Sequence, residues 1–395
     1  PSADADLYII NTCSVTQQAD RKCRQAIRKF IKRSPHAFIA VVGCYSQLKP
    51  DAIASIPGVD LVLGTSERGN IPLFLNNIEK RTKAKVYSCE NDLISDFFPA
   101  YSSADRTRSF LKVQDGCNYR CAYCTVPLAR GESRNILFFF KQKTAYEIAS
   151  MGVKEIVITG VNTGDFGRTT GESFLELIET LDTVVGIERY RISSIEPNLI
   201  TEEIIRFTAS SQKFMPHFHI PLQSGSDRVL ASMGRRYTRQ LFTERVEIVR
   251  STIPNAFIGV DVIVGFPGET DEDFEYTYSL LAQLTPSFIH VFPYSPRPNT
   301  RAATMPNQVK TSIIKQRATK LQELSIHLQR EFYKKHLGST DLVLFEGGRK
   351  GSSMHGFTSN YIKVKHPFER ELVGRIVRVS LDSIDPKGEI LVSIR

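Results

Sequence analysis

The sequence predicts an α/β protein in three parts: an N-terminal parallel α/β domain over residues 1–100, a central partial (β/α)6 barrel over 101–330, and a small all-β barrel over 331–395. Three observations predict it. Strand and helix patterns alternate in the first part, six widely spaced apolar segments separated by helical patterns follow, and short alternating segments close the chain.

The N-terminal part contains apolar segments at residues 6–11, 37–42 and 60–64, and a helical period from 17 to 33. Alternating strands and helices predict a parallel sheet, whose ligands bind at the carboxyl ends of the strands. Cys13 and Cys44 both follow such ends. The mixed polar stretch 89–106 is typical of a linker.

The central part has strand-like segments at 110–114, 155–159, 189–193, 217–220, 256–264 and 287–292. Six strands with helices between them indicate a parallel partial barrel with its site at the C-terminal rim. Residues 136–144 lie where a barrel helix should begin, but they show neither a cap nor a polar face. The stretch 136–147 resembles adapter-derived strings found in assembled sequence data, so we assign it no function.

The last part alternates over residues 341–345, 361–364, 374–380 and 389–394, with glycine and proline between the segments. This pattern is typical of a small all-β barrel. Residues 331–395 hold 11 basic and 8 acidic side chains, a net charge of +3.

The composition is that of a folded globular protein, with 41% hydrophobic and 24% charged residues in 395. The 51 basic and 42 acidic residues give a net charge of +9, which favours polyanionic partners. No apolar run approaches the roughly 20 residues that span a bilayer, so we expect a cytoplasmic protein with no membrane association. Seven cysteines cannot all pair within one chain, so their spacing carries more information than their number.

Three cysteines form a CxxxCxxC motif directly after the first central strand, at Cys117, Cys121 and Cys124. Three thiolates in one loop can hold three irons of a [4Fe-4S] cluster and leave the fourth open to an external ligand. A zinc site or a redox CxxC pair is the alternative. The aromatic Tyr123 before the last cysteine, and the position of the loop, favour the cluster.

The motif resembles the CxxxCxΦC signature of the radical S-adenosylmethionine (SAM) superfamily, with Tyr123 as the aromatic Φ. The resemblance is closest to the methylthiotransferase branch, and it covers nearly the whole chain, including a terminal barrel similar to a TRAM domain. It rests on four ordered segments: 115–118 (DGCN), 127–131 (PLARG), 219–226 (HIPLQSGS) and 261–270 (DVIVGFPGET).

Three further segments, 159–164, 191–196 and 290–295, most resemble the enzymes that modify threonylcarbamoyladenosine at position 37 of tRNA. Methylthiotransferases for isopentenyladenosine tRNA or for a ribosomal-protein aspartate are the alternatives within the family. A catalytically incomplete RNA-binding protein is the alternative of another class.

The resemblance implies that the cluster on Cys117, Cys121 and Cys124 binds SAM and generates a 5′-deoxyadenosyl radical, which removes the C2 hydrogen of the adenine. It also implies tRNA as a partner, and a flavodoxin or ferredoxin as electron donor; we expect a monomer. A second [4Fe-4S] cluster would use Cys13, Cys44 and a cysteine of a loop that precedes residue 1. We therefore expect a truncated N-terminal domain and an incomplete second cluster.

Two cysteines, Cys23 and Cys89, have no place in this pattern and are expected to be structural, although Cys23 could stand in for the missing ligand. The resemblance places the cofactor nucleoside at the barrel rim, and no single side chain is assigned as catalytic. Tyr123 is expected to contact SAM through its backbone. The other expected SAM contacts lie at strand ends: Gly160 and Asn162 after the second barrel strand, Ser194 and Glu196 after the third, and Gln223 and Gly265 at the ends of later strands.

Basic residues gather in three places, which suits phosphate contact with a folded RNA. Seven cations lie between residues 21 and 33. The expected RNA contacts are Arg24, Arg28, Arg235, Arg236, Lys363, Lys365, Arg375 and Arg378. His217 and His219 alternate on one strand and so face one side, where we expect hydrogen bonding in the barrel rather than a metal pair.

Overall fold

The computed structural model describes residues 5–76, 78–90, 94, 97–98, 100–102, 107–135, 138–347 and 352–395, with the backbone alone at 138–140. Parts of the expected linker 89–106 and residues 136–137 of the unusual stretch therefore lie outside the described residues. The chain forms two compact units. The first comprises 1–98, 115–134 and 295–305, and the second comprises 99–114, 135–294 and 306–395.

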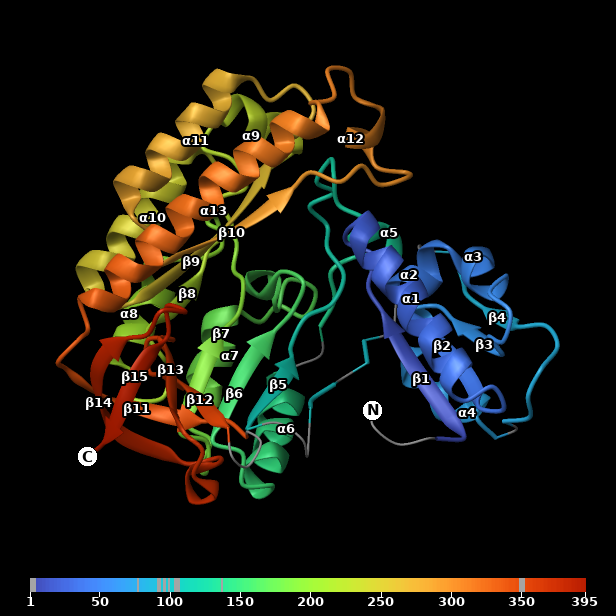
Figure 1. The fold of residues 1–395 in the computed structure, drawn as a ribbon, viewed down its shortest axis with the longest axis horizontal. Helices are drawn as coiled ribbons and strands as arrows, with labels where there is room; N and C mark the ends of the chain where they lie inside the picture. The colour runs from blue at the N-terminus through green and yellow to red at the C-terminus, as the bar shows by residue number, and fades with distance from the viewer. Residues whose placement is uncertain are drawn as a thin grey trace. The chain divides into compact units, whose positions relative to one another are not determined.

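The first unit is built on a parallel sheet in the order β1-β2-β3-β4 (Figure 1). Its strands are β1 (Leu7–Thr12), β2 (Phe38–Gly43), β3 (Leu61–Leu63) and β4 (Lys85–Tyr87). Its helices are α1 (Gln17–Arg33), α2 (Cys44–Leu48), α3 (Pro50–Ala54), α4 (Ile71–Phe74), α5 (Val126–Arg130) and α12 (Arg301–Thr304). The expected helix 17–33 is confirmed as α1, and Thr16 caps it by accepting the N–H of Ala19.

The second unit contains six parallel strands in chain order, which confirms the expected partial barrel. They form two three-stranded sheets, β5-β6-β7 and β8-β9-β10, which a parallel bridge between Ser194 and His219 joins. The strands are β5 (Arg108–Lys112), β6 (Glu155–Thr159), β7 (Arg189–Ile192), β8 (His217–His219), β9 (Phe257–Val264) and β10 (Phe288–Pro293).

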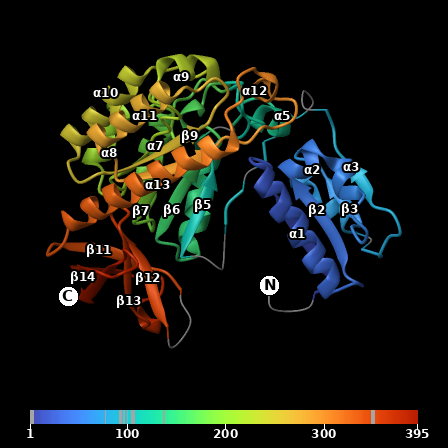
Figure 2. The ribbon, with the colours of Figure 1, turned by 45° about the horizontal axis from the view of Figure 1, so that its top comes forward.

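In the described part of the second unit, seven α-helices accompany these strands, and Figure 2 shows α10, α11 and α13 on the outer side of β9. Their apolar faces bury one continuous core with the strands. The helices are α6 (Phe138–Ser150), α7 (Phe174–Asp182), α8 (Glu202–Ser210), α9 (Asp227–Met233), α10 (Arg239–Thr252), α11 (Asp271–Leu284) and α13 (Thr311–Lys334).

A closed barrel, β11-β12-β13-β15-β14, completes the second unit and confirms the expected all-β end. Its strands are β11 (Thr340–Phe345), β12 (Ser353–Thr358), β13 (Lys363–Pro367), β14 (Ile376–Ile384) and β15 (Ile390–Ile394).

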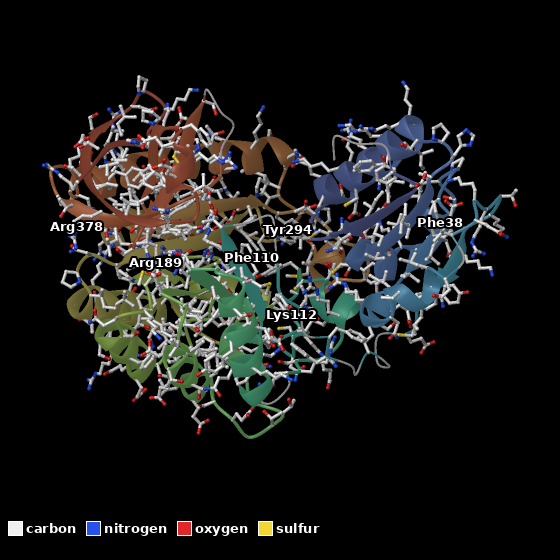
Figure 3. All side chains as sticks on the ribbon, turned by 90° about the horizontal axis from the view of Figure 1, so that it is seen from below. Phe38, Phe110, Lys112, Arg189, Tyr294 and Arg378 are labelled. Atoms are coloured by element: carbon white, nitrogen blue, oxygen red, sulfur yellow. The ribbon has the colours of Figure 1, made fainter. Side chains whose placement is uncertain are left out.

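Two buried arginines of β7 attach this terminal barrel to the parallel strands, and Figure 3 labels one of them, Arg189. Arg189 donates to the carbonyls of Leu342 and Phe357, and Arg191 donates to those of Thr358 and Ser359. Glu155, which is fully buried, offsets part of their charge and lies 3.0 Å from Arg191 and 4.0 Å from Arg189. Among the described residues, no helix is long and apolar enough to span a bilayer.

Candidate active site

The loop that carries Cys117, Cys121 and Cys124 is tightly fixed within the first unit. Asp115 and Arg134 exchange backbone hydrogen bonds, and the N–H of Cys117 donates to the carbonyl of Gly131. Gly116 has a φ of +71°, and a Cβ there would lie 1.8 Å from the carbonyl oxygen of Glu132. Only glycine therefore fits this turn.

Backbone N–H groups are directed at two of the three sulfurs. The N–H of Tyr119 lies 3.4 Å from the Sγ of Cys117, and the N–H of Val126 lies 3.4 Å from the Sγ of Cys124. Such donors stabilise thiolate charge, which is the form of cysteine that binds iron. The donor set thus fits an iron-sulfur cluster.

All three cysteines line one cavity of about 840 Å³ within the first unit. Arg120, Arg134 and Arg301 also line it. Thiolates together with guanidinium groups suit a metal cluster with an anionic ligand, because the positive charges can balance both. Tyr123 is half-buried beside Cys124 and does not line this cavity.

Cys13 and Cys44 lie at the carboxyl edge of the first unit's sheet, as the strand pattern predicts. Thr12 and Gly43 are register partners at the ends of β1 and β2, and a Cβ at Gly43 would lie 2.5 Å from the carbonyl oxygen of Thr12. The close approach of these two strand ends brings the segments that begin at Cys13 and Cys44 together.

The Cys44 sulfur accepts hydrogen bonds from two arginines, Arg130 at 3.3 Å and Arg68 at 3.8 Å. Burial alone would lower the pKa of Arg130, but Cys44 and Asp115 outweigh it and raise that pKa above its usual value. Arg130 therefore stays cationic beside the sulfur. Sequence reasoning missed this residue as a site residue, although it lies in the quoted 127–131 segment.

Cys23 lies on α1, and its sulfur is 3.6 Å from the carbonyl oxygen of Cys13. Burial raises the pKa of the Cys23 thiol, which favours the protonated form and a structural role. Cys89 is half-buried, and its carbonyl accepts from Gln47.

Within the second unit, the loop after β6 is held by a glutamine that sequence reasoning also missed. The Oε1 of the fully buried Gln114 accepts the N–H groups of Val161 and Asn162, each at 2.9 Å. Asn162 is 3% exposed, and neither polar atom of its side chain has a partner among the described residues. A buried amide without partners is costly, so it fits a bound polar ligand.

The other strand-end residues lie on neighbouring strands of the same unit. The carbonyl of Ser194 accepts from Thr163 at 2.8 Å, and Gln223 has a φ of 64° where it pairs with β9. The N–H of Gly265 donates to Glu269 at 2.7 Å. Gly160 packs against Gln114, which leaves little room for a Cβ.

Glu196 forms an ion pair with Arg235, whose side chain is 4% exposed. Burial raises the pKa of Glu196, and the guanidinium acts in the opposite direction. Arg235 thus neutralises a carboxylate inside the unit instead of presenting its charge to solvent. We therefore leave Arg235 out of the RNA-binding surface that is proposed below.

The remaining basic residues differ in how far they are exposed. Arg28, Arg236, Arg375 and Arg378 are exposed, whereas Arg24 packs against the Tyr45 ring. Lys363 pairs with Glu389, and Lys365 pairs with Asp385 at 3.0 Å. The two lysines thus contribute less net positive charge than the sequence suggests.

His217 and His219 line one cavity of the second unit, so they do face the same side. His219 hydrogen-bonds Asp261, as expected for a histidine inside the barrel, with 2.8 Å between Nε2 and Oδ1. Burial lowers the pKa of His217 well below its usual value.

A parallel six-stranded partial barrel, with a three-cysteine loop after its first strand, defines the class of radical SAM enzymes. The model of the Radical SAM superfamily matches residues 111–281, and that of Uncharacterized protein family UPF0004 matches residues 1–64. The chain belongs to the radical SAM methylthiotransferase family and is an enzyme that uses an iron-sulfur cluster and SAM to transfer a methylthio group.

The relatives that carry this assignment match over most of their length. The chain is 40% identical to threonylcarbamoyladenosine tRNA methylthiotransferase MtaB of Bacillus subtilis (strain 168), over 95% of this chain and 85% of that one. It is 37% identical to MtaB of Thermotoga maritima, and the match covers 99% of this chain and 89% of that one. It is 33% identical to the tRNA-2-methylthio-N(6)-dimethylallyladenosine synthase of Geobacter metallireducens, and the match covers 99% of this chain and 91% of that one.

Among solved structures, the radical SAM methyltransferase TsrM of Kitasatospora setae has a similar fold. Its TM-score is 0.60 at 14% identity, covering 100% of this chain and 75% of that one.

Proposed function

We propose that this chain adds a methylthio group to C2 of N6-threonylcarbamoyladenosine at position 37 of tRNA. The observation that carries the proposal is the convergence of Cys117, Cys121 and Cys124 on one cavity, with backbone N–H groups directed at two of the sulfurs. The similarity to MtaB over nearly the whole chain supports the choice of nucleoside. When bound, the cluster and SAM supply the radical chemistry at C2.

The chain's own residues would hold and orient these groups. The three cysteines would ligate the first cluster, and Asn162 would offer its buried amide to the methionine end of SAM. Ser194, Gln223 and Gly265 would lie against the nucleoside at the strand ends, and Gly160 would let Gln114 pack closely against the loop that carries Asn162. Glu196 would accept from the ribose hydroxyls, with Arg235 keeping the carboxylate ionised.

The test is anaerobic reconstitution of the protein from its full gene, followed by incubation with tRNA and nucleoside mass analysis. The expected product is the methylthio derivative of threonylcarbamoyladenosine, with no product on isopentenyladenosine tRNA. Cys121→Ala should abolish 5′-deoxyadenosine formation, and Cys89→Ala is the matched control that should retain it. Product on the isopentenyl nucleoside alone would contradict the choice of substrate.

We further propose that Cys13 and Cys44 are ligands of a second [4Fe-4S] cluster. The N–H donors of Arg130 and Arg68 at the Cys44 sulfur support an anionic iron-bound thiolate there. Iron analysis tests this: about eight irons per chain indicate two clusters, and about four indicate one. In the protein expressed from its full gene, Cys44→Ala should lower the count by about four, whereas Cys23→Ala should not change it.

For RNA binding, we propose the exposed cations Arg28, Arg236, Arg375 and Arg378 as phosphate contacts. Figure 3 shows Arg378 on the terminal barrel. The double variant Arg375→Gln/Arg378→Gln should weaken tRNA binding and reduce the slope of log K against log salt by about one to two. Lys363→Gln, which removes a cation that Glu389 already neutralises, is the control and should leave the slope nearly unchanged.

A further inference from the structure

Three side chains that can ligate a metal meet inside the parallel strands of the second unit. His219, Asp261 and His290 come from the adjacent strands β8, β9 and β10, and their ligand atoms lie within 4.8 Å of one another. Strand register explains the meeting. His290 is the register partner of Asp261, and His219 is the partner of Gly259, two residues earlier on β9. Because side chains alternate along a strand, positions 259 and 261 face the same side.

Packing already holds two of the three groups in contact. The Nε2 of His219 lies 2.8 Å from the Oδ1 of Asp261. The rings of His219 and His290 stack with their centroids 5.1 Å apart and an interplanar angle of 22°, and Phe288 packs edge-on against His290. All three ligand residues are half-buried. The group is therefore pre-organised and still reachable.

A cavity of about 510 Å³ lies beside this group, with His219 and His290 in its lining. It has room for an ion and for water on the coordination positions that the protein leaves open. Arg108, Arg191 and Lys363 also line the cavity, and each has a carboxylate partner, which for Lys363 is Glu389. Arg108 lies 2.6 Å from Glu346, and Arg191 lies 3.0 Å from Glu155.

We propose that His219, Asp261 and His290 form a binding site for one divalent metal ion of the zinc class. Two imidazoles and one carboxylate are a common ligand set for such ions, with the remaining positions open to water. Metal–ligand bonds of about 2.0–2.2 Å place the ligand atoms of a tetrahedral ion about 3.3–3.5 Å apart. The 2.8 Å pair of His219 and Asp261 would therefore separate slightly, and the His290 nitrogen would move closer to both. The site contains no sulfur, so it is separate from the cysteines, and it goes beyond the proposed function.

The test uses the holoenzyme with its iron-sulfur content assembled, washed with EDTA and then incubated with two equivalents of zinc chloride. After desalting, zinc and iron are counted by mass spectrometry. The expected result is about one zinc per chain with an unchanged iron count. X-ray absorption at the zinc edge should show nitrogen and oxygen ligands and no sulfur.

Variants assign the zinc to these residues. His290→Ala and the isosteric Asp261→Asn should each weaken zinc binding at least tenfold while the iron count stays the same. Gln329→Ala is the matched control, because Gln329 lines the same cavity but lies outside the group of three, and it should retain zinc. The proposal is overturned if the wild type retains no zinc, if His290→Ala binds zinc as tightly as the wild type, or if the spectrum shows sulfur ligands.

Discussion

Replacing Gln114 tests whether the loop after β6 depends on a single buried acceptor. Gln114→Met keeps the length and volume of the side chain but removes the oxygen that accepts the N–H groups of Val161 and Asn162. A buried N–H that loses its acceptor costs about 1–3 kcal/mol. The bond to Asn162 is buried and that to Val161 is partly exposed, so the two together predict a loss of about 2–4 kcal/mol.

The same change should weaken SAM binding, because the loop carries Asn162. We expect the dissociation constant for SAM to rise at least tenfold, with tRNA affinity unchanged. Urea unfolding followed by circular dichroism measures the stability, and equilibrium dialysis against labelled SAM measures the binding. Gln240→Met, at an exposed position of α10, is the control and should change the stability by less than about 0.5 kcal/mol. If Gln114→Met matches this control in both assays, the reasoning is wrong.

Three further changes test other parts of the structure. Burial lowers the pKa of Lys141 from 10.5 to about 7. The charged ammonium therefore lowers the free energy of unfolding, by the full amount below pH 7 and by a smaller amount as the pH rises toward 10.5. Lys141→Met removes this penalty but also the hydrogen bond from Nζ to the Lys112 carbonyl, so we expect a net gain of about 2–4 kcal/mol at pH 7, and thermal melts should show it shrinking by pH 10. Gly116→Ala should prevent assembly of the first cluster and lower the count by about four irons per chain, because its Cβ would collide with the Glu132 carbonyl. Arg297→Met removes the guanidinium partner of the buried Asp20 and leaves it the Ser14 hydroxyl and the more distant Lys49, so the melting temperature should reflect a loss of about 3 kcal/mol.

The sequence was most informative where one local pattern decides the structure. The segment 155–159 is confirmed as β6 with the same bounds, because its apolar run ends at Gly160.

Two strands of the described residues, β4 and β12, were not predicted from the sequence. Every residue of β4 is exposed, so it carries no apolar alternation, and β12 contains Gly356, whose Cβ would lie 2.5 Å from Val343. At that position the barrel requires a glycine that a strand pattern disfavours.

The spacing of Cys117, Cys121 and Cys124 predicts that they lie together, and they line one cavity, but the contacts that support them were not predictable. Gln114 lies 48 residues from its partner Asn162, and Arg130 lies 86 residues from Cys44. Contacts at such separations follow from how the elements pack, and no local spacing encodes them. The same holds for Arg235, which looks like part of a surface cluster until its ion pair with Glu196 is known.

Arg130 also shows that the two groups of cysteines in the first unit are physically linked. Its Nε donates to the Cys44 sulfur at 3.3 Å, and its Nη1 lies 3.2 Å from the Oδ1 of Asp115. Asp115 is two residues before Cys117, and its backbone anchors the cysteine loop to Arg134. One guanidinium thus neutralises a thiolate of the proposed second cluster while it fixes the loop of the first. A change at Arg130 therefore reaches both groups, so the two proposed clusters should not respond to substitution as independent sites.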